Sequence, residues 1–495
     1  MIRVMYHNES YVLIDCDDST FFEMKDYFSF FVEGYQYNPK YKYGAWSGKI
    51  SLLQHDRTLP YGLISYVQKF ADNYGHDIII DDSVKKPIGI SQEAFDEWLS
   101  KYSIYDGDKI IEPHWYQLDG VYKGITEEKK ILNLPTSAGK SLIQGLLSRY
   151  YYDHFEGKIL IIVPTIQLTT QMRDDLINYR LFTKNDIGIL SNKNKPKNET
   201  IVVSTWQSAI KQPQEWLEQF GMLLVDECHL ATGKSISSIT TGLTNCKFKI
   251  GLSGSLKDGK ANLMQYIGLF GDVYKPVGTA ELMDSGQVSR LKINALVVKY
   301  PDVLKAKLKR LTYPDEIKVI TKFRKRNEFV CKLAIKLAAK ENVFVMFRTT
   351  KHGEQLVDLI REMGYENVHI VHGKIDGSER DRLKHMVEKS DGMIVVASYG
   401  VFSTGISVKK LHHVILAHPV KSKITVLQTI GRVLRKHETK EVAKLWDIID
   451  DMSSTKTIKG QNRRVNINYA LKHGLARIER YGSENFDYSL KEYQL

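Results

Sequence analysis

Short, continuous apolar runs separated by helical patterns are the feature that most limits the fold of this 495-residue chain. A first block holds four such runs, at residues 158–164, 200–205, 222–227 and 248–254. The series stops near Gln287, and a second block holds four more, at residues 341–347, 367–373, 392–398 and 412–418. Strands that are apolar on both faces and alternate with helices form parallel sheets covered by helices on both sides. The sequence therefore predicts two successive α/β domains, each built on a parallel sheet.

The segments before and after these two blocks have a different composition and pattern. Residues 1–105 are rich in aromatics and carry alternating strand-like runs such as YVLID, which predicts a small α+β module. The two α/β domains are expected at residues 106–288 and 289–452. Residues 453–495 begin with the polar, basic segment SSTKTIKGQNRR, which suggests a linker. A helix from Asn466 to about Tyr481, packed on the second α/β domain, should follow it.

Composition excludes several classes. The four cysteines have no C-x-x-C or zinc-finger spacing, so a disulfide framework or zinc knuckle is not expected. No apolar run approaches the ~18–20 residues of a membrane span. The N-terminus lacks a signal-peptide layout, so an intracellular protein is expected.

The charge is uneven along the chain. Residues 1–100 carry 9 lysines and arginines against 15 acidic residues, a net −6, whereas the remainder carries 61 against 43, a net +18. Lysine and arginine on phosphates release counterions, so a basic body is compatible with a nucleic-acid partner. General solubility would explain the same charge.

The segment Ile131–Gln144, ILNLPTSAGKSLIQ, has the layout of a phosphate-binding loop between a short apolar strand and a helix. Gly139-Lys140-Ser141 ends the pattern G-x-x-x-x-G-K-[ST], but Leu134 stands where its first glycine should be. Exposed backbone N–H groups of such a loop wrap phosphates. Lys140 would reach the β- and γ-phosphates of ATP, and Ser141 would hold Mg²⁺. The nucleotide contacts expected from the loop are Thr136, Ser137, Ala138, Gly139, Lys140 and Ser141. A GKS before a helix also arises by chance.

Further along, MLLVDECH ends a predicted strand with two carboxylates. Asp226 would bind Mg²⁺, and Glu227 would orient and deprotonate the water that attacks ATP. Acidic residues at a strand end are common, so this signal gains weight only from its order after the loop.

A third element, QTIGRVLR, lies in the second α/β domain. Arg432 and Arg435 are three residues apart and should face one side of a helix. A planar guanidinium can clamp a γ-phosphate and stabilise the charge that develops as the bond breaks. Gln428 begins the same motif.

DECH resembles the DExH box of superfamily-two helicases, and the other elements fall in that family's order. In many loops of that family the first position is not glycine, and PTSAGKS resembles the family's P-T-[small]-[small]-G-K-[ST] form, with Ser137 and Ala138 in place of glycines often seen there. QTIGRVLR resembles motif VI. His229 in the DExH box then suits coupling of the γ-phosphate to motif VI better than metal binding.

The resemblance implies two tandem RecA-like parallel-sheet domains with ATP in the cleft between them, and a nucleic-acid-dependent ATP hydrolase. EPHWYQLDGV resembles the adenine-gripping element, with Gln117 as the reader and Trp115 or Tyr116 as stacking candidates. IIVPTIQ, STWQS and SYGVFSTGISV resemble motifs that hold the nucleic-acid backbone, which implies contacts from Thr165, Thr205 and Thr404. GLSGSL resembles motif III, which couples hydrolysis to strand contact.

Over essentially its full length the chain resembles the UvsW-type recombination helicases of T4-like bacteriophages. Long strings carry the likeness, including NPKYKYGAWSGKISLL, DECHLATGKSISSI and GRVLRKH. The resemblance implies an ATP-dependent DNA helicase that remodels branched DNA in recombination, repair and fork rescue. D-loops, R-loops with their RNA, Holliday junctions and strand annealing belong to that activity. It also implies a monomer in the cytoplasm of an infected bacterium, with other recombination proteins as partners.

The segment Asn38–Ile50 mixes cations with aromatics, which suits phosphates together with base stacking. DNA or junction contacts are therefore expected from Lys40, Lys42 and Trp46. A strand here would put Lys40 and Lys42 on one face and the tyrosines between them on the other. Aromatic strands more often form a core, and this module is acidic overall.

Three alternatives stay open at this point. The motifs do not separate a DNA helicase from an RNA helicase. The chain could be a DNA-binding and annealing protein that ATP regulates, or the motor subunit of a restriction enzyme.

Overall fold

The computed structural model describes residues 1–495 except 33, 85, 88, 192–193, 231–233, 255, 257–259, 308–310, 405–407 and 459–460. The side chains of residues 234, 260–262, 306–307, 403–404, 423–424, 455–458 and 461–463 also lie outside the description. The chain divides into two compact units, Met1–Pro276 and Val277–Leu495. Within the described part, no helix combines the length and apolarity that crossing a membrane requires.

The first unit begins with a four-stranded sheet in the order β5-β2-β1-β6. Its strands are β1 (Ile2–Tyr6), β2 (Tyr11–Asp15), β5 (Thr58–Pro60) and β6 (Ile78–Ile80). Helices α1 (Asp18–Tyr27) and α3 (Ile64–Tyr74) bury apolar side chains against it. The predicted α+β module is thus present.

The second sheet of this unit has seven strands in the order β11-β12-β10-β13-β14-β9-β15, and every pairing is parallel. Its strands are β9 (Lys129–Asn133), β10 (Lys158–Val163), β11 (Ile187–Leu190), β12 (Ile201–Thr205), β13 (Phe220–Asp226), β14 (Phe248–Ser253) and β15 (Val273–Tyr274). The helices around it include α5 (Trp115–Glu127), α6 (Lys140–His154), α7 (Ile166–Asn178) and α11 (Lys260–Phe270). β13 and β14 are buried along almost their whole length, as parallel strands covered by helices on both faces must be.

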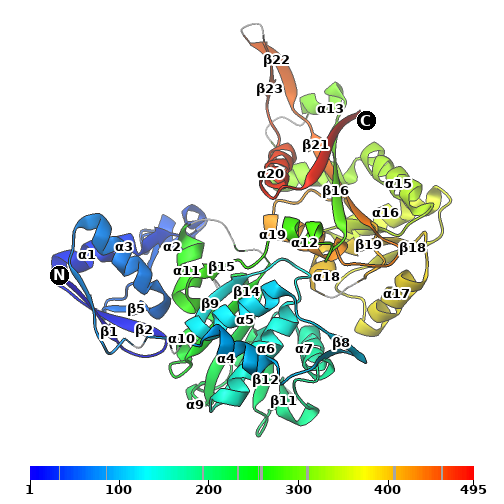
Figure 1. Ribbon diagram of the computed structural model, residues 1–495. Helices are drawn as coiled ribbons and strands as arrows, with labels where there is room; N and C mark the ends of the chain where they lie inside the picture. Colours follow the sequence, from blue (N-terminus) through cyan, green and yellow to red (C-terminus); the bar gives the residue numbers. More distant parts are fainter. Residues whose placement is uncertain are drawn as a thin grey trace. The chain divides into compact units, whose positions relative to one another are not determined.

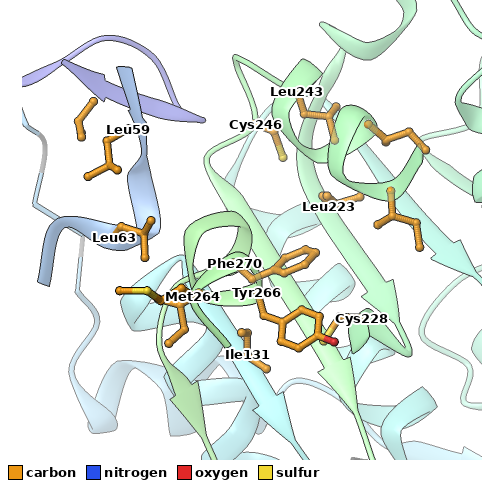
Figure 2. Packing of buried hydrophobic residues seen from close by; sticks show 14 of the residues in the cluster. Leu59, Leu63, Ile131, Leu223, Cys228, Leu243, Cys246, Met264, Tyr266 and Phe270 are labelled. Carbon is orange, nitrogen blue, oxygen red and sulfur yellow. The ribbon is translucent and has the colours of Figure 1, made fainter. Parts of the chain in front are cut away.

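One hydrophobic core runs through both sheets of the first unit. Leu59 of β5 and Leu63, in the 3-10 turn that follows β5, belong to the same buried cluster as Met264 and Phe270 of α11, which Figure 2 shows from close by. Gly62 lies at this contact, and a Cβ there would stand 1.8 Å from the carbonyl oxygen of Ile267. The N-terminal module is therefore fused to the first α/β domain by a shared core.

The second unit holds another seven-stranded parallel sheet, in the order β18-β19-β17-β20-β21-β16-β24. Its strands are β16 (Arg290–Lys299), β17 (Val343–Phe347), β18 (Val368–Val371), β19 (Ile394–Ser398), β20 (His413–Leu416), β21 (Val442–Asp451) and β24 (Asp487–Gln494). Helices α15 (Arg324–Ala338) and α16 (Thr350–Glu362) contribute to the core on one face. On the opposite face lies α20 (Tyr469–Ser483), as Figure 1 shows. Its Leu471 packs in a buried cluster with Ala295, Val297 and Ile449.

The predicted basic linker is instead an antiparallel hairpin of β22 (Ser454–Ile458) and β23 (Gln461–Val465). Threonine and isoleucine within the segment favour strands. The high charge of the segment led to the prediction of a linker instead. The chain then passes through α20 and returns to the sheet as β24, an edge strand beside β16. The predicted helix is confirmed as α20, but no strand was expected after it.

Candidate nucleotide site and nucleic-acid contacts

The predicted phosphate loop connects β9 to α6 in the first unit. Gly139 is the N-terminal cap of α6 at φ 75°, and Ser137 also has a left-handed φ of 76°. The first N–H groups of a helix lack intrahelical acceptors, and the helix dipole makes that end positive. A phosphate would therefore meet the backbone of Lys140 and Ser141 where the sequence pattern places it.

Gln117 braces this loop. Its Nε2 donates to the Ala138 carbonyl at 2.9 Å, and its Oε1 accepts from the His114 N–H at 2.8 Å. A Cβ at Gly139 would lie 2.2 Å from Gln117 Nε2, so any larger residue there would displace the Gln117 amide, in addition to the strain of its positive φ. Of the two predicted stacking candidates, Trp115 is 61% exposed and Tyr116 is buried. Recognition of adenine by Gln117 stays a prediction.

The two carboxylates follow β13. Glu227 Oε1 lies 3.9 Å from Lys140 Nζ, so the structure brings together the loop lysine and the predicted water-activating group. Glu227 has φ 53°, a backbone conformation that costs a non-glycine residue free energy and is typical of functional sites. Burial, and then the neighbouring charge of Glu227, raise the pKa of Asp226, while Lys140 partly offsets this.

These carboxylates fit the Mg²⁺ that the loop implies. Within the described residues, Asp226 Oδ1 is a buried acceptor without a hydrogen-bond partner. Carboxylate and hydroxyl oxygens are the protein ligands that Mg²⁺ takes beside phosphates. A divalent cation beside Asp226 would stabilise its ionised form, which burial alone disfavours.

β14 lies between β13 and β9 in the sheet, so its carboxyl end separates the acidic pair from the loop. Ser253 ends β14, and its Oγ lies 3.0 Å from His229 Nδ1. The same Nδ1 lies 3.1 Å from Glu227 Oε2, and the His229 carbonyl accepts from the Tyr266 hydroxyl at 2.8 Å. The DExH histidine therefore touches the motif III strand directly.

Two site residues were missed by sequence reasoning. Ser141 Oγ lies 3.0 Å from the Tyr179 hydroxyl, at the end of α7. Burial raises the pKa of Asp175 in α7 to about 6, and a hydrogen bond with Ser141 partly offsets this. No motif marks either residue, because only the packing of α6 against α7 brings them to the loop.

The two nucleic-acid contacts expected from the first unit differ in how exposed their side chains are. Thr165 lies two residues beyond the end of β10, and Thr205 is the last residue of β12. The two β-strands are neighbours in the sheet, with Val163 in register with Thr205. Thr165 caps α7 and is half-buried, with its Oγ1 accepting from the Leu168 N–H at 3.4 Å. Thr205 is 4% exposed and its hydroxyl donates to Ser208 Oγ. A nucleic-acid contact at Thr205 would therefore come from its backbone.

The basic and aromatic segment of the N-terminal module is not a strand. Residues Pro39–Lys42 form a short helix, α2, so the predicted alternation of two faces is wrong. Asn38 caps this turn by accepting from the Lys40 N–H, a local bond that competes with strand pairing. Lys40 and Lys42 are exposed, and the indole N–H of Trp46 donates to the Lys49 carbonyl at 2.8 Å.

In the second unit, Gln428 and Arg432 lie on α19 (Lys423–Val433). Arg435 lies two residues beyond the end of this helix, so the expectation that both arginines share a helix is wrong. Leu434 caps α19, and the chain then turns toward β21. Thr404 ends α18 (Tyr399–Thr404), and its side chain lies outside the described part of the chain.

Two tandem RecA-like units with these motifs in order define a superfamily-two helicase motor. Family models match in the same order along the chain. "DNA helicase UvsW, N-terminal" covers residues 1–81, "Type III restriction enzyme, res subunit" covers 86–258, and "Helicase conserved C-terminal domain" covers 325–437.

The ATP-dependent DNA helicase uvsW of Enterobacteria phage T4 is 55% identical over 501 residues, covering 100% of both chains. The crystal structure of T4 UvsW matches with 53% identity, a TM-score of 0.54 and coverage of 100% and 99%. A fragment of a putative HsdR subunit of a type I restriction enzyme from Vibrio vulnificus matches with 15% identity and a TM-score of 0.58. The match covers 81% of this chain and 74% of the fragment, and at this identity it shows the fold alone. The chain belongs to the UvsW helicase family and is an ATP-dependent helicase. The predicted fold class is confirmed.

Proposed function

We propose that this helicase is a DNA translocase that remodels branched DNA in recombination, repair and replication-fork rescue. Its substrates would be D-loops, R-loops and Holliday junctions, with strand annealing as a second activity, in the cytoplasm of the infected bacterium. The full-length identity to a protein named as an ATP-dependent DNA helicase supports DNA as the substrate. The four-part division at residues 105, 288 and 452 and the monomeric state are part of the same proposal.

The observation that carries the chemistry is the approach of Lys140 to Glu227 at 3.9 Å beside the helix end of the phosphate loop. ATP would lie with its phosphates on the backbone of residues 136–141. Lys140 would then exchange Glu227 for the β- and γ-phosphates. Glu227, released from that cation, would orient the attacking water and take its proton, giving ADP and phosphate.

Ser141 and Asp226 would hold Mg²⁺, which neutralises phosphate charge when bound. Arg432 and Arg435, with Gln428, are proposed to contact the γ-phosphate and stabilise charge that develops as its bond breaks. Thr165, Thr205 and Thr404, together with Lys40, Lys42 and Trp46, are proposed as DNA contacts. Backbone contacts carry little sequence information, as a translocase requires.

The His229–Ser253 contact gives this chemistry a route to the strand-binding loops. His229 touches both Glu227 and Ser253 at the end of β14, so a change at the γ-phosphate would shift this strand end, which forms the first half of GLSGSL. Ser253→Ala is expected to uncouple unwinding from hydrolysis more than it lowers hydrolysis.

The test is ATP hydrolysis by the wild type and by Lys140→Ala, with forked DNA, linear duplex and RNA as stimulants. Strongest stimulation by forked DNA, lost in Lys140→Ala, is expected. Stimulation by RNA alone would refute the DNA assignment. Chelation of Mg²⁺ should abolish hydrolysis, and its persistence would refute the roles of Ser141 and Asp226. Annealing that survives in Lys140→Ala would show that it does not depend on the motor.

A further inference from the structure

The second unit carries a basic pocket at the amino ends of its parallel strands. A cavity of about 410 Å³ is lined by residues of β16, β20 and β21 and by the last turn of α15. In a parallel sheet the opposite, carboxyl edge carries the loops that follow β19 and lead into SYGVFSTGISV. None of the residues that line the pocket belongs to a motif described above.

The strand register concentrates positive charge in this pocket. Lys292 of β16 is in register with Lys444 of β21, so the two side chains share one face of the sheet. Lys336 in the last turn of α15 and Lys340, two residues beyond the helix end, line the same cavity. Lysines placed directly opposite on neighbouring strands repel each other.

The protein does not neutralise these lysines. Among the described residues, no ion pair includes Lys292, Lys336 or Lys340, and the one carboxylate in the lining is Glu341. Glu341 is already engaged, at 2.6 Å from His413 Nε2 and 3.4 Å from Lys444 Nζ. Four lysines against one glutamate give the lining a formal charge of +3, which favours an anionic ligand.

An oriented aromatic ring lies among these cations. Trp446 follows Lys444 on the same face of β21, and its indole N–H donates to His413 Nδ1 at 3.2 Å. Since Nδ1 accepts this bond, the His413 proton is on Nε2, which donates to Glu341. Burial lowers the pKa of His413 to about 4, so the imidazole stays neutral at pH 7 and the chain of bonds holds. The half-buried indole is thereby fixed in orientation with part of its surface on the cavity.

Asn294 completes the polar lining. It is in register with Trp446, and its Oδ1 accepts from the Ser489 hydroxyl at 3.3 Å. Its amide N–H groups can therefore donate to a ligand in the cavity. A rigid ring beside an amide and several lysines suits a base with its phosphates.

We propose that this pocket binds a segment of single-stranded DNA, with one base on Trp446 and the flanking phosphates on Lys292, Lys336 and Lys340. A phosphate alone would not use the indole, and a neutral aromatic ligand would not use the lysines. A duplex does not present the face of a base, whereas a single strand does. This assignment rests on the proposed action on branched DNA, in which more than one strand leaves the junction.

The test uses the full-length protein and a short oligodeoxynucleotide that carries 5-iodouracil, which crosslinks to aromatic side chains on irradiation. Peptide mapping should find a crosslink at Trp446 in the wild type. The triple variant Lys292→Gln/Lys336→Gln/Lys340→Gln should lose that crosslink at least tenfold. The matched control Lys325→Gln/Lys332→Gln/Lys389→Gln removes three exposed lysines of the same unit and should keep it.

Salt dependence gives a second readout. The logarithm of affinity falls as the logarithm of salt concentration rises, with a slope of about −0.7 for each phosphate contact on a single strand. Loss of three contacts in the triple variant should therefore make this slope shallower by about 2 for the mapped site. Circular dichroism melting of both triple variants confirms that each is folded. Absence of a Trp446 crosslink in the wild type, or equal loss in both triple variants, would overturn the proposal. Complete competition by excess thymidine monophosphate would overturn the single-strand assignment in favour of a free nucleotide.

The two proposals fail separately. Lys140→Ala removes hydrolysis but should keep the Trp446 crosslink. A protein whose ATPase activity responds to RNA alone would refute the branched-DNA function whatever the crosslink shows.

Discussion

Replacement of Gly139 by alanine tests whether the phosphate loop is held in shape by Gln117. Gly139 has φ 75°, a conformation that costs an L-residue about 1–2 kcal/mol. The new Cβ would also stand 2.2 Å from Gln117 Nε2. Gln117 cannot move away freely because it makes hydrogen bonds to Ala138 and His114, each contributing about 0.5–1.5 kcal/mol. The expected cost of Gly139→Ala is therefore about 2–5 kcal/mol.

Most of this cost should be relieved by distortion of the loop, which would weaken phosphate binding before it unfolds the domain. Since 1.36 kcal/mol corresponds to a tenfold change, kcat/KM for ATP should fall by about 30-fold or more. Steady-state ATPase kinetics and urea denaturation measure the two effects. Gly75→Ala is the matched control, because Gly75 has φ 72° with no atom within 4 Å of its added Cβ.

Gln117→Ala combined with Gly139→Ala completes the cycle. Removal of the glutamine side chain leaves the strain in φ and eliminates the clash. The double variant should therefore lose less than the sum of the two single variants. Strict additivity, or equal kinetics for Gly139→Ala and Gly75→Ala, would refute the bracing role of Gln117.

Three further predictions follow from the same contacts. Glu227→Gln should keep ATP binding, measured with a fluorescent analogue, while its kcat falls by a factor of about 10²–10⁴. Lys140→Ala should lose both ATP binding and hydrolysis. An unchanged kcat in Glu227→Gln would exclude Glu227 as the general base. Burial lowers the pKa of Lys249 to about 7, so between pH 7 and its unfolded value near 10.5 the unfolded chain holds a proton that the folded chain has released. The stability of the wild type relative to Lys249→Met, from urea denaturation, should therefore rise by up to ~1.4 kcal/mol per pH unit from pH 7 to 9, and a flat or falling difference would contradict the shift. Arg326 donates to Asp450 at 3.0 and 3.1 Å. Arg326→Met should cost about 3–5 kcal/mol because it leaves the buried Asp450 carboxylate without a counter-charge, with the Tyr300 hydroxyl as its remaining side-chain donor among the described residues, and Asp450→Leu in the same chain should recover most of the loss.

The sequence allowed both parallel sheets to be predicted because their central strands are apolar on both faces. The second sheet shows where this signal ends. β17, β18, β19 and β20 were expected, whereas the inner strands β16 and β21 and the edge strand β24 were not. In their first halves β16 and β21 alternate buried residues with more exposed ones, and β24 exposes almost every residue. Edge strands need apolar residues on one face at most, so they lack the continuous run that identifies a central strand.

The site divides in a similar way. Lys140, Asp226 and Glu227 could be placed from spacing, because chemistry fixes their residue types at the ends of strands. Tyr179 and Asp175 could not, since they reach Ser141 only through packing of two helices. The wrong expectation for Asn38–Ile50 has a local cause, because Asn38 and Pro39 start a helical turn, while the alternation of lysine and tyrosine suggested a strand.

β14 links the two halves of the first unit through its two ends. At its amino end Lys249 Nζ donates to Ser10 Oγ of the N-terminal module at 2.6 Å. The same amino group donates to the Thr240 carbonyl at 3.0 Å. At its carboxyl end Ser253 touches His229 beside the nucleotide site. A strand six residues long cannot shift at one end and stay fixed at the other, because each backbone group is paired with β13 or β9. Movement of the DExH histidine during hydrolysis would therefore be transmitted to the N-terminal module as motion of one rigid body, so the DNA contacts proposed for Lys40 and Lys42 would move with the motor domain.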